Sequence, residues 1–287
     1  MAKVIDAKEM DIRQLNSTLK GLAEDVKRVI IENPKGKHFI AAGLSRNLEV
    51  EINGSTGYFV GTMIHGPSIR VRGNAGWFAA DNMTSGEVII HGHAGNGPGQ
   101  GIYGGIVVIE GDAGERVGAL MKRGTVIVGG NTSIMTGLYM MGGEIIVLGN
   151  LGDYAGESII GGQILFAGEV SGLGKNAKLD KPTESEGEKT EKLLKEYGYE
   201  VSGVTFRKIV PEKTRPFYKG EDKTNPAFRR TYSRYQVFLN QALCNKCKVC
   251  IGLCPQNVFQ VINDYIMPVN ETECVRCEIC MEYCLPR

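Results

Sequence analysis

Cysteine is absent from the first 243 residues of this 287-residue chain, and all 8 cysteines lie between Cys244 and Cys284. This distribution excludes a fold held together by disulfides along its length and favours metal ligation near the C-terminus. No apolar run reaches the ~18 residues of a membrane-spanning helix, so we expect no membrane partner. The net charge of +1 gives no overall attraction to nucleic acid.

The first residues, MAKVIDAKEMD, also lack the hydrophobic segment of a signal peptide. We therefore expect a cytoplasmic protein. Neither a Ser/His/Asp arrangement nor a carboxylate pair of defined spacing stands out, so no catalytic residue is predicted.

Glycine, in contrast, is abundant, with 39 residues, because a nineteen-residue repeat runs from Ser55 to Gly168. Consecutive blocks fit this period without an insertion or deletion. Each block ends in a short β-branched run closed by glycine, which predicts one strand and one corner. The closing glycines are Gly73, Gly92, Gly111, Gly130, Gly149 and Gly168. A preceding block, 36–54, keeps only the strand and the final glycine.

A period this short predicts a solenoid, because one block cannot bury its own apolar residues and has to stack on its neighbours. Positions fifteen and seventeen of each block, such as Val107 and Ile109, are expected to line a continuous core. We predict a mainly β protein built on a right-handed, single-stranded parallel β-helix, with the handedness taken from the usual crossover rule. A leucine-rich repeat is excluded, since no block carries a helical leucine pattern.

The β-helix is placed at 36–177, and the preceding segment, 1–35, is expected to hold an N-terminal capping helix. Asp11 can cap this helix, whose apolar stripe continues to Val29 and which Asn33-Pro34 ends. The helix is expected to cover the open end of the β-helix, and binding of a partner is the alternative.

The segment 178–234 is expected to contain a charged helix and an extended docking arm. Ser185–Glu188 forms a capping-box pattern at the start of the helix, which ends at Gly198. Residues 199–234 carry nine basic and four acidic residues with interleaved aromatics. Because no nucleic-acid module surrounds them, an arm laid on another domain or subunit is favoured over a nucleic-acid site.

Two features inside the repeat imitate ligand sites. Residues 99–104, GQGIYG, match the dinucleotide fingerprint G-x-G-x-x-G, but a strand rather than a helix follows. His91 and His93 could approach a metal, yet no cysteine or acidic ligand cluster accompanies them. We therefore expect both histidines to be surface residues and no nucleotide site here.

Two cysteine runs of equal spacing, C-x2-C-x2-C-x3-C, define the last segment, 235–287. This is a bacterial ferredoxin spacing, in which the fourth cysteine of a run serves the other cluster. Four-cysteine zinc sites use two separated C-x2-C pairs instead. We predict two [4Fe–4S] clusters in an α+β, ferredoxin-like domain. Cluster 1 takes Cys244, Cys247, Cys250 and Cys284, and cluster 2 takes Cys274, Cys277, Cys280 and Cys254.

Strands are expected at 235–239, 258–262 and 265–269. The second cysteine run departs from the ferredoxin pattern, because Pro286 is displaced by one residue and Arg287 follows at once. The usual closing strand is then missing, and a partner could complete the sheet edge.

The repeat, as in GDAGERVGALMKRGTVIVGG at 111–130, resembles the G-x-G-x-G β-helix domain of glutamate synthases. The resemblance spans about Val4 to Ala177 and includes GLGKNA at 172–177. That domain is the C-terminal part of the large subunit, or a separate polypeptide in archaeal-type and N-methylglutamate synthases. A similar β-helix occurs in one of the subunits of formylmethanofuran dehydrogenase, so the repeat indicates fold more firmly than function. The segment 235–287 resembles dicluster ferredoxins.

The glutamate synthase resemblance implies a scaffold and electron-transfer subunit of an oxidoreductase that makes glutamate from glutamine and 2-oxoglutarate. The implied partners are a glutaminase-type amidotransferase subunit and an FMN-barrel subunit that carries FMN. The ferredoxin segment would relay electrons to that flavin from a redox donor such as ferredoxin or an NAD(P)H–flavin subunit.

Two alternatives stay open. The chain could be the β-helix and ferredoxin subunit of formylmethanofuran dehydrogenase, or of another molybdenum or tungsten oxidoreductase, and carry electrons outward from the active site. It could also be a non-enzymatic ferredoxin joined to an interaction solenoid.

Overall fold

The computed structural model describes residues 2–213, 239, 241–242, 244–254, 257–269 and 280. The chain divides into two compact units, Met1–Glu212 and Lys213–Arg287. The first unit holds the repeat and its flanking segments, and the second holds all 8 cysteines.

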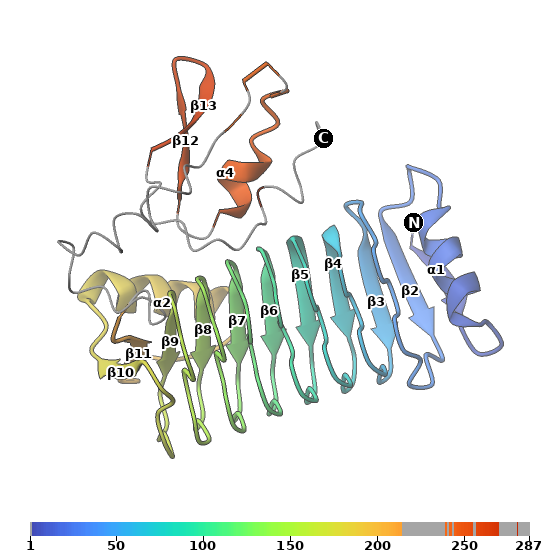
Figure 1. Ribbon diagram of the computed structural model, residues 1–287. Helices are drawn as coiled ribbons and strands as arrows, with labels where there is room; N and C mark the ends of the chain where they lie inside the picture. The colour runs from blue at the N-terminus through green and yellow to red at the C-terminus, as the bar shows by residue number, and fades with distance from the viewer. Residues whose placement is uncertain are drawn as a thin grey trace. The chain divides into compact units, whose positions relative to one another are not determined.

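The first unit is a parallel β-helix whose strands stack in sequence order (Figure 1). From β3 to β9, strand residues pair with the residue nineteen positions later, as Val88 does with Val107 and Val107 with Val126, except at the start of β4, where His65 pairs with Ser85. The predicted mainly β solenoid is therefore confirmed. Its parallel strands are β1 (Lys3–Asp6), β2 (Arg28–Glu32), β3 (Glu49–Asn53), β4 (His65–Val71), β5 (Ser85–Ile90), β6 (Ile106–Ile109), β7 (Thr125–Val128), β8 (Glu144–Val147) and β9 (Gln163–Phe166).

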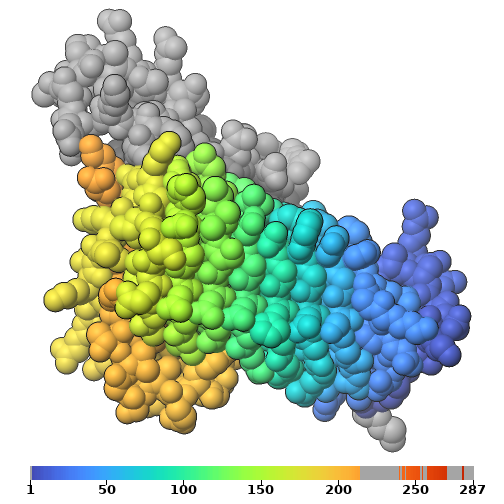
Figure 2. Space-filling view, turned by 90° about the horizontal axis from the view of Figure 1, so that it is seen from below, coloured from blue at the N-terminus to red at the C-terminus, as the bar shows by residue number. Residues whose placement is uncertain are grey.

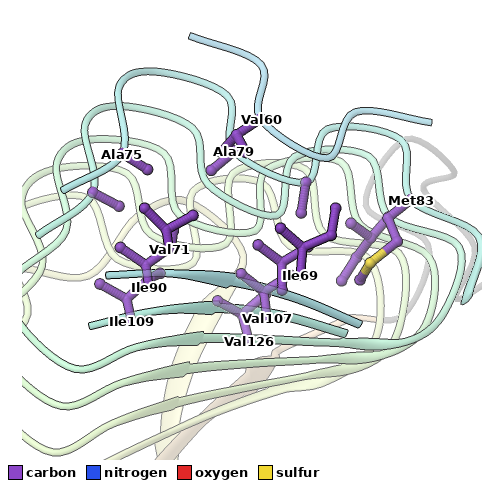
Figure 3. Close-up of a cluster of buried hydrophobic side chains, with 14 of the residues drawn as sticks. Val60, Ile69, Val71, Ala75, Ala79, Met83, Ile90, Val107, Ile109 and Val126 are labelled. Atoms are coloured by element: carbon purple, nitrogen blue, oxygen red, sulfur yellow. The ribbon is translucent and has the colours of Figure 1, made fainter. Parts of the chain in front are cut away.

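The interior of the coils is filled by equivalent side chains from successive strands (Figure 3). Val71, Ile90 and Ile109 are fully buried in one row, and Ile69, Val107 and Val126 belong to a second row. Met83 packs into the same core from the side of the coil, and Val60 and Ala79 lie opposite the strand rows. Because these rows repeat in every coil, the core is continuous along the stack.

Backbone and packing both favour glycine at the seventh position of a block, where Ala80, with a φ of 59°, is the exception. Gly118 has a φ of +61°, a left-handed conformation that side chains disfavour. A Cβ there would lie 2.6 Å from Cδ1 of Ile145. The strand residue of the next coil thus occupies the space that a side chain would need.

A polar ladder follows one corner of the β-helix. The side chain at the first position of each block accepts a hydrogen bond from the backbone N–H nineteen residues later, with N···acceptor distances of 2.7–3.0 Å. The closing glycines leave room for these side chains, since a Cβ on Gly92 would lie 2.2 Å from Oδ1 of Asn74. The ladder consists of Ser55, Asn74, His93, Asp112, Asn131 and Asn150.

The N-terminal end differs from the predicted long helix. Asp11 does cap a helix, and its capping box with Gln14 is present, but α1 covers only Ile12–Lys20. Gly21 ends α1, and Val29 lies in β2, which pairs with β3. The apolar residues after Gly21 therefore belong to another coil of the solenoid. Leu15 and Leu19 of α1 are fully buried in the common core, so α1 covers this end as expected.

At the other end, β11 (Arg207–Pro211) pairs antiparallel with β9, and β10 (Ala177–Asp180) pairs antiparallel with β11. The predicted arm thus begins as a strand of the sheet, and residues 214–234 lie outside the described part. Figure 2 shows the coils in sequence order, from the blue N-terminal end to the yellow and orange end.

Helix α2 (Glu184–Glu196) packs on the outward face of the sheet. Its N-cap is Thr183, with Glu186 completing the capping box, so the helix begins earlier than predicted. Within the helix, Glu191 and Lys195 form an i,i+4 ion pair at 2.9 Å. Leu194 and the segment up to Phe206 cover an outward row of apolar strand residues, namely Ile89, Val108, Ile127, Ile146 and Leu165.

The described part of the second unit contains helix α4 (Val249–Leu253) and a hairpin of β12 (Phe259–Ile262) and β13 (Tyr265–Pro268). This hairpin agrees with the strand pair predicted at 258–262 and 265–269. The strand expected at 235–239 lies almost wholly outside the described residues. Of the helices described in either unit, none has the length and apolar character to cross a membrane.

Candidate functional site

Most of the described cysteines of the second unit gather around a small apolar cluster. Its buried members are Cys254, Val258, Phe259 and Ile266. Three further cysteines pack against this cluster, together with Leu239 and Ile251; they are Cys244, Cys250 and Cys280. Cys247 is exposed. Four of the five described cysteines thus share one apolar environment, although they come from two separate runs of the sequence.

Local backbone geometry turns the first run around these thiols. Lys246 and Lys248 adopt left-handed conformations, with φ of 60° and 59°, which fold the loop before α4. Cys250 lies in the first turn of α4, and the backbone N–H of Cys254 donates to its carbonyl at 3.2 Å. The backbone N–H of Val258 donates to Sγ of Cys254 at 3.3 Å.

The cysteine loop is tied to the hairpin by charge. Nζ of Lys246 pairs with the carboxylate of Asp264 in the turn between β12 and β13, and it lies 5.3 Å from the ring centroid of Tyr265. This ion pair raises the pKa of Lys246 and lowers the pKa of Asp264. Gln241 adds a hydrogen bond of 2.7 Å from Nε2 to the carbonyl of Ile266.

The donor set fits an iron–sulfur cluster in its chemistry. Soft thiols lie among apolar side chains, and one sulfur already accepts a backbone N–H bond, an interaction that tunes cluster potentials. Burial raises the pKa of the Cys250 thiol, so its thiolate needs a bound cation to be stable there.

Neither predicted ligand set is complete in the described part of the chain. Of cluster 1, Cys244, Cys247 and Cys250 are described. Of cluster 2, Cys254 and Cys280 are described, and both belong to the apolar cluster. Within the described residues, no group of three or more His, Cys, Asp or Glu side chains is arranged to hold a metal ion. The remaining predicted ligands, Cys274, Cys277 and Cys284, lie outside the described residues.

The histidines of the repeat have structural partners. His93 belongs to the polar ladder, where its Nδ1 accepts the N–H of Asp112 at 2.9 Å. His91 lies between Arg72, 3.0 Å from Nε2, and Glu110, 2.7 Å from Nδ1. The GQGIYG segment precedes β6, and its Gly99 and Gly101 take left-handed positions of the coil.

A polar cleft of about 300 Å³ lies on the outward face of the sheet, beside the end of α2, and no sequence pattern points to it. Tyr197 donates to Glu87 at 2.9 Å, and Arg70 lies 3.3 Å from the same carboxylate. Burial, followed by Glu87, raises the pKa of Tyr197. The cleft is lined by Arg70, Glu87, Ile89, His91, Val108, Glu110, Glu196 and Tyr197.

The burial of the Asp81 carboxylate was also not predicted from the sequence. It accepts hydrogen bonds from Nδ2 of Asn82 at 2.9 Å and from Nε2 of Gln100 at 3.3 Å. Burial raises its pKa above the ordinary aspartate value. A single aspartate inside a regular repeat carries no sequence signal of burial, because its neighbours decide its environment.

A family model described as the GXGXG motif matches residues 13–197, which is more than half of the chain. The chain belongs to the GXGXG motif family. The match covers nearly all of α1, the coils and α2 and ends before the first cysteine, so the cysteine-containing unit lies outside the matched region. No curated protein matches the chain in sequence.

Among solved structures, this GXGXG protein is similar to a chain of the formyltransferase/hydrolase complex from Methylorubrum extorquens, determined in complex with methylofuran. The TM-score is 0.56 and the sequence identity is 21%. The alignment covers 71% of this chain and 89% of the other. At this identity the similarity establishes the shared fold.

Proposed function

We propose that this chain is the β-helix and electron-carrying subunit of a multi-subunit oxidoreductase of the formylmethanofuran dehydrogenase type. The observation that carries the proposal is the similarity to one chain of the formyltransferase/hydrolase complex. The alignment covers 89% of that chain. That complex was solved with methylofuran bound. The two cysteine runs, which lie outside the family match at 13–197, supply the redox part of the proposal.

The β-helix acts as the scaffold. In residues 2–213, many of the described side-chain hydrogen bonds connect neighbouring coils, as in the ladder and the Arg72–His91–Glu110 row. Such contacts make the rod rigid, and a rigid element holds partner active sites at fixed separations. The chemistry on the substrate therefore belongs to partner subunits.

The second unit carries electrons. Cys244, Cys247, Cys250 and Cys284 would hold one [4Fe–4S] cluster, and Cys254, Cys274, Cys277 and Cys280 would hold the other. When bound, these clusters supply one-electron transfer. The chain's own residues would shield the clusters from water through Val258, Phe259 and Ile266, and the N–H of Val258 would stabilise the negative charge on the Cys254 sulfur.

A glutamate synthase-type complex is the second candidate, favoured by the GLGKNA segment after the last coil. Within this segment, Nδ2 of Asn176 donates to the carbonyl of Ile159 at 2.6 Å, and Leu173 forms a parallel β-bridge with Ala155. The partners would then be a glutaminase-type subunit, an FMN-binding subunit and a redox donor.

Purification of the native complex through a tag on the full chain distinguishes the two. We expect a pterin cofactor with molybdenum or tungsten, no FMN, and a subunit that acts on formyl groups. If the purified complex contains FMN and a glutaminase-type subunit, the first candidate is wrong and the second is supported. A chain that purifies without any partner would contradict the scaffold function itself.

A further inference from the structure

An exposed aromatic surface covers the N-terminal coils of the β-helix. Two columns of stacked rings form it, and the ring centroids within each column are 4.6–5.0 Å apart. Large parts of these side chains reach solvent: 44% of Phe39, 40% of Tyr58 and 45% of Trp77, the chain's one tryptophan. We call this the aromatic face; it consists of His38, Phe39, Tyr58, Phe59, Trp77 and Phe78.

The aromatic face is held by the backbone of the coils. The N–H of Phe39 donates to the carbonyl of Tyr58 at 2.7 Å, and the N–H of Phe59 donates to that of Trp77 at 2.8 Å. Nδ1 of His38 accepts the N–H of Tyr58 at 2.7 Å. The rings are therefore ordered before any partner arrives, and binding costs little side-chain entropy.

The fold does not require aromatic residues at these positions. In the later coils, the place of Tyr58 and Trp77 is taken by Asn96, Glu115, Ile134 and Asp153. Those coils keep the same strand register. The stacks add some stability to the N-terminal coils, but exposed tryptophan and tyrosine on a rigid support are typical of binding hot spots.

Charge around the aromatic face is mainly positive, although Asp6 lies near enough to Lys35 for an electrostatic interaction. Lys35 and Lys37 precede its first residues, and the carbonyl of Lys37 accepts the N–H of Gly57 beside Tyr58. Residues 52–64 and 73–80 contain no Asp or Glu, and Asp81 is buried. An incoming partner therefore meets apolar rings with a positive edge.

We propose that the aromatic face is the docking surface for a partner subunit, which inserts an apolar segment flanked by acidic side chains. The proposal rests on the scaffold function above and names one surface that performs it. The apolar part packs on Tyr58 and Trp77, and the acidic part pairs with Lys35 and Lys37. Neighbouring charges of opposite sign set the orientation of the segment.

Photo-crosslinking in the native complex tests the location. The full chain carries Trp77→benzoylphenylalanine, and Tyr154→benzoylphenylalanine in the last coil is the matched control at an exposed aromatic of the same arc. We expect position 77 to crosslink to an apolar, acidic peptide of another subunit, and position 154 not to reach that peptide. Crosslinking of position 77 to nucleic acid, to a second copy of this chain, or to nothing would overturn the proposal.

Retention of partners measures the strength of the contact. We expect Tyr58→Ala/Trp77→Ala to reduce the amount of co-purifying partner by at least about tenfold, as for hot-spot residues, whereas Tyr154→Ala retains it. Lys35→Glu/Lys37→Glu leaves the rings intact and should also weaken retention of the partner. This second variant keeps the test valid if the alanine variant misfolds. If the partners co-purify undiminished with both variants, the docking surface is wrong and the scaffold function stands. If no partner co-purifies with the unmodified chain, the scaffold function fails as well.

Discussion

The side-chain oxygen of Asn131 accepts a hydrogen bond of 2.9 Å from the backbone N–H of Asn150, the equivalent residue of the next coil. Asn131 also donates its own N–H to Oδ1 of Asp112 at 2.7 Å. The same exchange recurs along the corner of the β-helix, so each coil positions the next. The ladder explains why the repeat tolerates Ser, Asn, Asp and His at this place, since each has an acceptor one or two bonds beyond Cβ.

Removal of one member of the ladder should weaken the stack. Asn131→Ala leaves the N–H of Asn150 without its acceptor, and we expect the free energy of unfolding to fall by about 1–2 kcal/mol. Lys189→Ala on the exposed side of α2 is the control and should stay within about 0.5 kcal/mol of the unmodified chain. Denaturant titration measures both, and equal effects would contradict the role of the ladder.

Two glycine substitutions should have opposite effects. Gly118→Ala places a Cβ 2.6 Å from Ile145 at a positive φ, so we expect a loss of about 1–3 kcal/mol from overpacking and strain. Gly187→Ala lies in α2, where a Cβ meets nothing within 4 Å. It should stabilise the chain by about 0.5–1 kcal/mol through helix propensity. Thermal unfolding compares the pair, and a stable Gly118→Ala variant would show that the coil can repack.

Tyr199 makes stability dependent on pH in the alkaline range. Its hydroxyl is buried over Gly129 and makes no hydrogen bond. Burial, followed by the Glu110 carboxylate, raises its pKa to about 12. The tyrosine of the unfolded chain ionises near pH 10. The contribution of Tyr199 to the free energy of unfolding is therefore fully present below about pH 10 and is lost as pH rises through 12.

Tyr199→Phe should therefore make the alkaline decline shallower. At pH 7 we expect its unfolding free energy to be equal to that of the unmodified chain or up to about 1 kcal/mol higher, since a buried hydroxyl without a partner is removed. Tyr154→Phe, which removes an exposed hydroxyl, is the control. An unchanged slope between pH 10 and 12 for Tyr199→Phe would show that the hydroxyl is hydrated in solution.

The cysteine assignment predicts a graded loss of iron. Cys254→Ser removes one ligand of cluster 2 only, so we expect iron to fall by up to about half while the spectroscopic signal of cluster 1 remains. Gln260→Ala on the exposed side of β12 is the matched control and should keep the full iron content. Loss of both clusters from Cys254→Ser in a folded chain would contradict the assignment of this cysteine to a separate site.

The regular part of the fold was predictable from sequence, because a fixed period states which residues stack. Val88, Val107 and Val126 pair as the nineteen-residue spacing requires. Asp11 begins α1 as predicted, since a cap depends on residues within one turn. The end of α1 was not predictable from the apolar stripe, because Val29 satisfies helical spacing while its burial comes from pairing with β3.

The covering of the outer sheet face was also missed, although a signal was present. The middle residue of each later strand is apolar from Ile89 to Leu165, whereas the N-terminal strands carry Glu51 and Arg70 at this place. An outward apolar row indicates a covering element, and α2 is that element. The aromatic face and the polar cleft were not predictable, because they depend on which coils lie side by side and on where α2 ends.

Native mass spectrometry of the complex, purified without oxygen, tests the central claim most directly. We expect an assembly with at least one other subunit, from which this chain is released with the added mass of two [4Fe–4S] clusters. A chain that carries zinc or no metal, or one that is found alone, would contradict the proposed function.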